Sequence, residues 1–227
     1  MLSSKLFPWQ KNKKKKTIYN KKKNEELIQE LKSEGIVNEK ILTAIRMVPR
    51  ELFTEKLDEA YENKALSVEC GQTLTQPFCT AYMASFLNLK ETDNILDIGC
   101  GVGWSTAVFS KLVKTVFTME RFKKLLDIAK KNIAKLKIEN VQFKLGNGFE
   151  GWGDKTLFDA ITIGAASEVV PVKLLESLKS NGRLIMPKKY EAGNQKLLLV
   201  TKKSGNFEQK ELLDVKFVPL LNKATVK

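Results

Sequence analysis

Three glycines alternate with other residues in the segment LDIGCGVGW, residues 96–104. The apolar run before them is typical of a buried strand, and an acid, Asp97, stands two residues ahead of the first glycine. Glycine adopts backbone conformations that other residues avoid, and it lets a ligand approach the main chain closely. The segment therefore predicts a strand, a ligand-binding turn and a helix in succession, as in an α/β sheet.

Predicted strands and helices alternate along the chain from residue 94 to residue 187. Strands are expected over residues 94–99, 115–120, 141–147, 158–166 and 182–187, and helices over 104–113, 122–137 and 172–179. Two further strand-like runs, 196–202 and 211–220, flank a turn at Gly205 and predict an antiparallel hairpin. The expected fold class is α/β: a doubly wound, mostly parallel, seven-stranded Rossmann-like sheet with that hairpin at its end.

Helices also precede the predicted sheet. Two are expected to begin at Asn24 and Asn38 and to end at Gly35 and Pro49, and a third is expected over residues 79–89. The connection from residue 60 to residue 78 is irregular and long, and long structured loops tend to carry function.

The net charge of +13 is concentrated in a tail. Residues 1–23 contain nine lysines and no acid, which predicts an unfolded extension that is either solvated or in loose contact with nucleic acid or anionic lipid. The rest is expected to be one domain, 24–227, in which helices and a substrate loop (24–93) precede a cofactor-binding core (94–190) and the hairpin (191–227).

Cysteine usage and hydropathy limit the cellular compartments in which the protein is expected. The three cysteines, Cys70, Cys79 and Cys100, form no CxxC pair, which argues against a disulfide framework or a zinc site and fits a reducing cytoplasm. No apolar window approaches the length needed to span a membrane, and the N-terminus lacks a signal-peptide core. We expect a cytoplasmic protein without a metal site.

The glycine turn does not fit the common phosphate-binding patterns. A dinucleotide fingerprint would need a glycine at position 104, where the chain has Trp104, and no Gly-Lys-Ser/Thr follows. What remains is an acid at a strand end followed by Gly99, Gly101 and Gly103, which suits a cationic nucleoside without phosphate. S-Adenosylmethionine is such a molecule, and we predict it as the cofactor.

Two more strand ends offer polar groups to the same edge of the sheet. Glu120 closes the second strand, where its carboxylate can accept hydrogen bonds from both ribose hydroxyls. Asn147 and Gly148 follow the third strand, where an amide could meet the adenine edge. Because ligands bind at the carboxyl ends of parallel strands, these residues and Asp97 predict one cofactor site in a methyltransferase-type domain.

The kind of acceptor is limited by what the chain lacks. The Asn/Asp-Pro-Pro-aromatic run of adenine methyltransferases is absent after the fourth strand, where residues 163–167 read IGAAS. The cysteines have no adjacent base, and the chain contains no histidine, which excludes catalysis by imidazole. The acceptor must therefore need little deprotonation, a requirement that a carboxylate meets.

Several segments resemble protein-L-isoaspartate O-methyltransferases, in the family's order, over about residues 25 to 222. They are MVPRELF (47–53), AYENKALSVECGQTLTQP (60–77), ILDIGCGVGWSTAV (95–108), LFDAITIGAASEVVP (157–171), GRLIMP (182–187), GNQKLLLVTK (193–202) and VKFVPL (215–220). The Gly-Gln-Thr-x-Ser/Thr-Gln-Pro element within the second of these segments is the most diagnostic.

The resemblance implies an activity and a set of site residues. Enzymes of this family methylate the free α-carboxylate of isoaspartyl residues in damaged proteins and peptides, and the ester then collapses toward a succinimide. The family's active-site serine falls on Thr75, and Gln72 and Thr73 are expected to bind the substrate in the same loop. We expect a monomer that does not act on nucleic acid.

The chain departs from the family pattern at several of these positions. Asn147 replaces an aspartate that contacts adenine, Trp104 replaces the usual tyrosine, and Glu69 stands where the family has glycine. An extra anion beside a site for an anionic substrate would repel it. Three alternatives therefore stay open: the same chemistry on one dedicated peptide aspartate, a catalytically silent adaptor with this fold, and an RNA methyltransferase steered by the tail.

Overall fold

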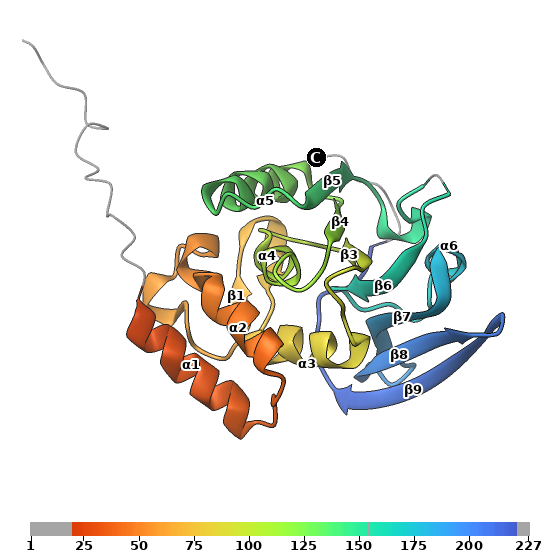
Figure 1. Ribbon diagram of the computed structural model, residues 1–227, viewed down its shortest axis with the longest axis horizontal. Helices are drawn as coiled ribbons and strands as arrows, with labels where there is room; N and C mark the ends of the chain where they lie inside the picture. Colours follow the sequence, from red (N-terminus) through yellow and green to blue (C-terminus); the bar gives the residue numbers. More distant parts are fainter. Residues whose placement is uncertain (1–19, 154, 222–227) are drawn as a thin grey trace, which may run out of the picture.

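A seven-stranded sheet forms the centre of the computed structural model, which describes residues 20–153 and 155–221 (Figure 1). The strand order is β5-β4-β3-β6-β7-β8-β9. The first five strands in this order run parallel, and β8 and β9 are antiparallel additions at one edge. The bounds are β3 Asn94–Ile98, β4 Thr115–Glu120, β5 Val141–Leu145, β6 Phe158–Ile163, β7 Leu178–Lys189, β8 Gln195–Lys203 and β9 Asn206–Asp214. The predicted fold class is confirmed.

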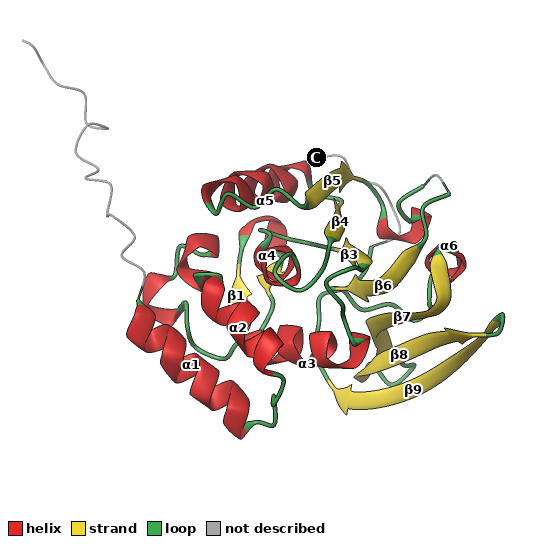
Figure 2. Cartoon of the chain, viewed as in Figure 1, coloured by secondary structure: helices red, strands yellow, loops and turns green. Residues whose placement is uncertain are grey.

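Helices cover both faces of this sheet (Figure 2). Helices α3 (Pro77–Leu87), α4 (Trp104–Phe109) and α5 (Lys123–Lys135) lie on one face, and the short α6 (Val172–Glu176) lies on the other. Because side chains alternate along a strand, Ile95 packs in one hydrophobic cluster while Leu96 and Ile98 pack in another. Both faces of β3 are therefore buried, as its mostly apolar sequence predicts.

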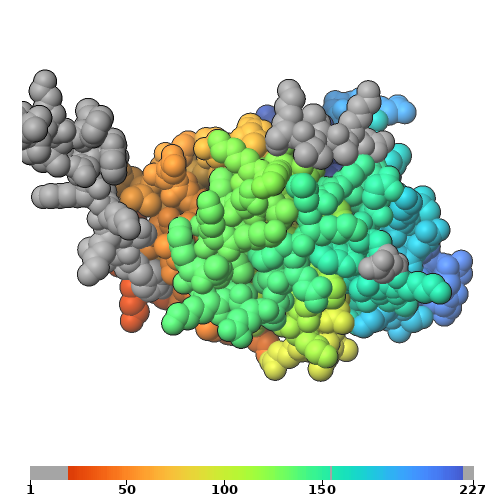
Figure 3. Space-filling view, turned by 90° about the horizontal axis from the view of Figure 1, so that it is seen from above, coloured from red at the N-terminus to blue at the C-terminus, as the bar shows by residue number. Residues whose placement is uncertain are grey.

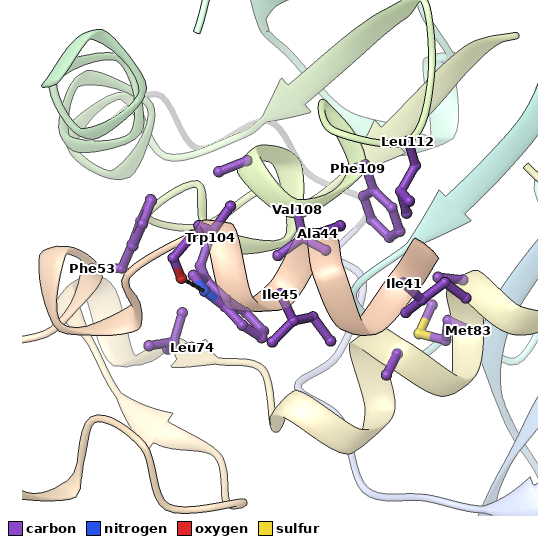
Figure 4. Close-up of a cluster of buried hydrophobic side chains, with 14 of the residues drawn as sticks. Ile41, Ala44, Ile45, Phe53, Leu74, Met83, Trp104, Val108, Phe109 and Leu112 are labelled. Atoms are coloured by element: carbon purple, nitrogen blue, oxygen red, sulfur yellow. Dashed lines mark hydrogen bonds between the residues drawn. The ribbon is translucent and has the colours of Figure 1, made fainter. Parts of the chain in front are cut away.

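The N-terminal helices form an outer layer against α3 and α4. Helix α2 (Glu39–Met47) begins after Asn38, whose side chain caps it as predicted. Its residues Ala44 and Ile45 meet Trp104 and Phe109 of α4, which joins this layer to the sheet (Figure 4). None of the helices in the described ranges is long and apolar enough to cross a membrane.

Two predicted boundaries near the N-terminus are wrong. Helix α1 spans Lys21–Ser33 and is capped by Asn20, so the tail cannot extend to residue 23. Asn24 is not the cap but a buried residue of the first turn, where its amide donates a hydrogen bond to the Arg46 carbonyl. Residues 1–19, the rest of the predicted tail, lie outside the described residues.

Boundaries also differ in the second half of the chain. Helix α4 ends at Phe109, four residues earlier than predicted, and α6 ends at Glu176. The hairpin turns at Ser204 and Gly205, whose positive φ angles allow β9 to pair from Asn206 onward. Residues 215–220, predicted as the end of that strand, lie beyond β9. Val215 still hydrogen-bonds to Gln195 of β8, and the chain then reaches Ala166, whose backbone hydrogen-bonds with Val218 and Leu220.

The irregular segment before α3 contains a small hairpin. Strands β1 (Leu66–Ser67) and β2 (Thr73–Leu74) pair antiparallel, and a short 3-10 turn, Glu69–Gly71, connects them. We call residues 66–75 the substrate hairpin, because they carry the residues that the sequence assigns to the substrate. It lies beside the carboxyl ends of β3 and β4.

Candidate active site

A hollow opens at the carboxyl edge of the sheet, where β3, β4, β5 and β6 end. We call it the inner hollow. It is lined by Gln72, Thr73, Leu74, Thr75, Ile98, Gly99, Cys100, Gly101, Val102, Trp104, Ser105, Met119, Glu120, Arg121, Phe122, Gly146, Gly148, Gly164, Ala165, Val218, Pro219, Leu220 and Leu221. Seven of the ten predicted site residues are in this lining, and Asp97, Gly103 and Asn147 are not.

The glycine turn exposes its backbone to the inner hollow. Gly99 and Gly101 have φ angles of +83° and +54°, and a Cβ atom added at either would meet nothing within 4 Å. Gly103 has a different role, because an added Cβ would lie 3.1 Å from Cβ of Ala129 in α5. The first two glycines leave room for a ligand, and the third lets α4 and α5 pack closely.

Glu120 at the end of β4 is buried and oriented by backbone groups. One carboxylate oxygen accepts a hydrogen bond of 2.9 Å from the Gly101 N–H, and the other accepts from the N–H groups of Arg121 and Phe122. Burial raises the pKa of this carboxyl, and these three donors oppose the rise. The carboxylate is thereby fixed at the wall of the hollow, next to the glycine turn.

Asp97 lies beneath the glycine turn rather than in the lining. Its carboxylate is 2% exposed and accepts a hydrogen bond of 2.6 Å from the Thr106 hydroxyl of α4. Burial raises the pKa of Asp97 to about 6. Its negative charge can act on a ligand through the turn, and direct contact with a cofactor stays a prediction.

At the end of β5, two glycines line the inner hollow, and the side-chain amide of Asn147, which was predicted to do so, does not. The Asn147 side chain accepts a hydrogen bond of 3.1 Å from the Phe149 N–H, while its neighbours Gly146 and Gly148 line the hollow. A Cβ added at Gly148 would lie 2.5 Å from Cγ2 of Ile98, so only glycine fits there. The adenine-binding role of Asn147 stays a prediction.

A second hollow, the outer hollow, adjoins the first at the substrate hairpin. It has a volume of about 470 Å³ and lies between this hairpin, the start of α3 and the segment after β9. Thr73 and Thr75 line both hollows, and neither hydroxyl has a hydrogen-bond partner among the described residues. Two free hydroxyls therefore stand where a molecule in one hollow would meet a molecule in the other.

Arg50 anchors the last residue of the substrate hairpin and the segment that precedes the hairpin, a role that the sequence alone does not indicate. The fully buried guanidinium donates hydrogen bonds to the carbonyls of residues 60, 62, 64 and 75 at 2.9 to 3.4 Å. It also lies over the ring of Trp104, 5.1 Å from the ring centre. Burial lowers the pKa of Arg50 to about 9. Arg50 lies in the segment MVPRELF, and no local pattern in that segment indicates a contact with residues 60–75.

Glu69, the departure expected to repel an anionic substrate, lines neither hollow. Its carboxylate lies 2.7 Å from the Lys124 ammonium of α5. The charge that appears unbalanced in the sequence is thus paired by a residue of a distant segment.

The remaining wall of the inner hollow is formed by residues that the sequence did not single out. Among them are Met119, Arg121 and Phe122 around Glu120, and Val218, Pro219, Leu220 and Leu221 on the segment after β9. The segment VKFVPL contains three of them, but it reaches the hollow only because it leaves the hairpin.

Known proteins are similar to this chain in sequence and in fold. The sequence profile of the family described as protein-L-isoaspartate(D-aspartate) O-methyltransferase matches residues 21–225. Protein-L-isoaspartate O-methyltransferases of Parvibaculum lavamentivorans and Dictyoglomus turgidum are 40% and 43% identical, over 86% and 88% of this chain and 90% and 91% of their own. A solved Plasmodium falciparum structure of this description, with S-adenosyl-L-homocysteine, has a TM-score of 0.80 at 28% identity, covering 88% of this chain and 99% of its own.

Proposed function

Because this chain belongs to the protein-L-isoaspartate(D-aspartate) O-methyltransferase family, we infer that it methylates L-isoaspartyl residues in damaged proteins and peptides. The methyl donor is S-adenosylmethionine, and the reaction initiates repair of the damaged residue. The observation that carries this function is the family match, which spans every candidate site residue. The relatives do not favour an enzyme for one dedicated peptide or a silent adaptor.

The inner hollow fits the donor by its chemistry. Open backbone at Gly99 and Gly101 and the carboxylate of Glu120 suit a nucleoside with a free amino acid part. Asp97 supplies negative charge beneath the turn for a cationic group, and apolar side chains such as Ile98 and Leu220 offer a surface for a base. We propose that Glu120 binds the ribose hydroxyls and that the glycine turn holds the amino acid part.

The acceptor approaches from the outer hollow in this proposal. Thr75 donates its hydroxyl hydrogen to one oxygen of the acceptor carboxylate, and Gln72 and Thr73 shape the same passage. The second carboxylate oxygen is then free to form the new C–O bond. An isoaspartyl carboxyl is ionised at neutral pH, so alignment rather than deprotonation is required.

Exclusion of water is the other contribution of the chain. S-Adenosylmethionine, when bound, supplies a methyl group on a positively charged sulfur. Because an anion and a cation neutralise each other in the transfer, water stabilises the reactants more than the transition state. The apolar wall formed by Ile98, Met119 and Leu220 favours the reaction by removing that solvation.

A pair of peptides tests the function. One carries an isoaspartyl residue, and its twin carries a normal aspartyl residue in the same sequence. We expect methyl transfer, measured as released methanol after ester hydrolysis, with the first peptide and background rates with the second. Equal rates on both peptides, or no transfer to several unrelated isoaspartyl sequences, would contradict the proposal.

We further propose that the protein acts as a monomer in the cytoplasm and does not methylate nucleic acid. The three cysteines are all free, which suits a reducing compartment. All proposed site residues come from one chain, so one copy completes the site. Cell fractionation and light scattering test these two points, and assays with RNA test the third.

A further inference from the structure

The tip of the substrate hairpin is held to helix α5 by the ion pair between Glu69 and Lys124. The tip residues Glu69, Cys70 and Gly71 are exposed, and the last two have φ angles of +59° and +65°. Backbone hydrogen bonds in the tip join Val68, Glu69 and Gln72 to one another rather than to the sheet. In the space-filling view, the orange surface that precedes the hairpin adjoins the green surface of α5 (Figure 3).

Each partner lies close in sequence to residues that line the inner hollow. Glu69 stands three residues before the lining segment Gln72–Thr75, and Lys124 stands two residues after the lining segment Glu120–Phe122. The ion pair therefore joins the substrate hairpin to the first turn of α5, the helix that follows Glu120. The pair itself lines neither hollow, but it ties together two segments whose neighbours do.

We propose that Glu69 and Lys124 are positioning residues whose ion pair holds the substrate hairpin over the bound cofactor. With the pair formed, Gln72, Thr73 and Thr75 stay opposite Glu120, and the cofactor product leaves only after the pair breaks. The identity of the ligand rests on the proposed function, whereas the contact does not.

The pair suits a contact that must open in every cycle. Its side chains are 50% and 59% exposed, so water and salt reach both charges. The neighbouring Lys123 pairs instead with Asp127 one turn along the same helix, which leaves Lys124 directed to the hairpin.

Dissociation of S-adenosylhomocysteine, followed by stopped-flow fluorescence, tests the proposal. At low salt we expect Glu69→Gln and Lys124→Gln each to increase the dissociation rate constant about threefold, within the usual range for exposed pairs. The double variant should match either single variant, and the exchanged pair Glu69→Lys with Lys124→Glu should restore the slow rate. Lys123→Gln, which breaks a pair of similar exposure within α5, should leave the rate unchanged.

The effect of salt on the dissociation rate constant provides a second test, because a contact with a merely structural role would not change this rate. Raising NaCl to about 1 M should speed dissociation from the unmodified protein toward the rate of the variants and leave the variants unaffected. Single variants that dissociate at the original rate, additive effects in the double variant, or no rescue by the exchange would each overturn the proposal.

Failure of the proposed function has a different signature. If these rates follow the expected pattern but no isoaspartyl peptide is methylated, the ion-pair contact stands and the acceptor assignment is wrong. If peptides are methylated but the rates do not respond to the substitutions, the function stands and the positioning role is wrong.

Discussion

At the scale of single residues, the site depends on buried charges whose partners come from distant segments. Arg50 is held by four backbone carbonyls and an aromatic ring. A guanidinium suits this place because it presents five donors in a fixed plane, whereas the ammonium of lysine cannot reach several carbonyls at once. The arginine thereby joins the substrate hairpin to the residue that begins α4.

Arg50→Met should lower the free energy of unfolding by about 3 kcal/mol or more, because it leaves buried carbonyls without donors. Urea denaturation measures this change. Arg46→Met, which removes an arginine that is 33% exposed and paired with Glu25, is the control and should cost less than about 1 kcal/mol. Equal losses in the two variants would contradict the role assigned to Arg50.

Affinity for S-adenosylmethionine should depend on the protonation of Asp97. Since its pKa is about 6, binding that needs the carboxylate should weaken about tenfold between pH 7 and pH 5. The stability of the ligand-free protein should change with pH in the opposite direction to the affinity. The folded state holds the Asp97 proton more tightly than the unfolded state, so the free energy of unfolding falls as pH rises from about 4 to about 6. Calorimetric titrations from pH 5 to pH 8 measure the affinity, and Asp97→Asn should abolish the step. If the affinity of Asp97→Asn changed with pH by the same amount, the pH dependence would belong to another group.

Residue types at strand ends indicated much of the site, but not the direction of each side chain. Gly99, Gly101 and Glu120 line the inner hollow, whereas the side chain of Asp97 points toward Thr106 of α4. Successive side chains of a strand point to opposite faces, so Asp97 and the last residue of β3, Ile98, lie on different faces of the sheet. The pairing of Glu69 with Lys124 joins positions 55 residues apart, which no local pattern can indicate.

At the scale of elements, apolar runs and turn residues predicted the strands, and the ends of helices were less predictable. Strands β3 and β4 match their predicted ranges within one residue, because both faces are buried and polar residues bound them. Residues 215–220 have a strand-like sequence, but hydrogen bonds to Ala166 draw them over the inner hollow. Tertiary contacts, not propensity, decide their course.

Position 148 in the turn after β5 should tolerate no side chain. Gly148→Ala would place Cβ against Ile98 and force the turn toward the inner hollow, so we expect about tenfold weaker binding of S-adenosylhomocysteine. In Gly146→Ala the new atom would meet only the flexible Met119 side chain at 3.3 Å, and a smaller loss is expected. Calorimetry on both variants gives the comparison, and unchanged affinity in Gly148→Ala would refute the close fit.

At the scale of the whole molecule, the two hollows lie within the described ranges, while six lysines of the chain lie in residues 1–19. Every residue that lines the two hollows falls between Ala65 and Leu221. Where the two hollows meet depends on the packing of the substrate hairpin against the sheet, which the sequence alone could not reveal. The lysines of residues 1–19 are therefore no part of the lining of the two hollows, and we expect them to affect association with charged molecules more than the reaction.

Removal of residues 2–19 should leave the melting temperature and the turnover of a neutral isoaspartyl peptide unchanged within about twofold, because the cut lies before α1. Thermal unfolding and initial rates at low and high salt measure both quantities. A large loss of turnover at all salt concentrations would show that the tail contributes to the site.

The central claim is that a cofactor at the strand ends and an acceptor at Thr75 meet where the two hollows join. The most direct test compares Thr75→Ala with Glu120→Ala, measuring turnover of an isoaspartyl peptide and the Kd of S-adenosylhomocysteine for each. We predict that Thr75→Ala lowers kcat about tenfold or more with little change in Kd, and that Glu120→Ala raises Kd at least as strongly. An unchanged kcat in Thr75→Ala, or an equal loss of cofactor affinity in both variants, would contradict the account.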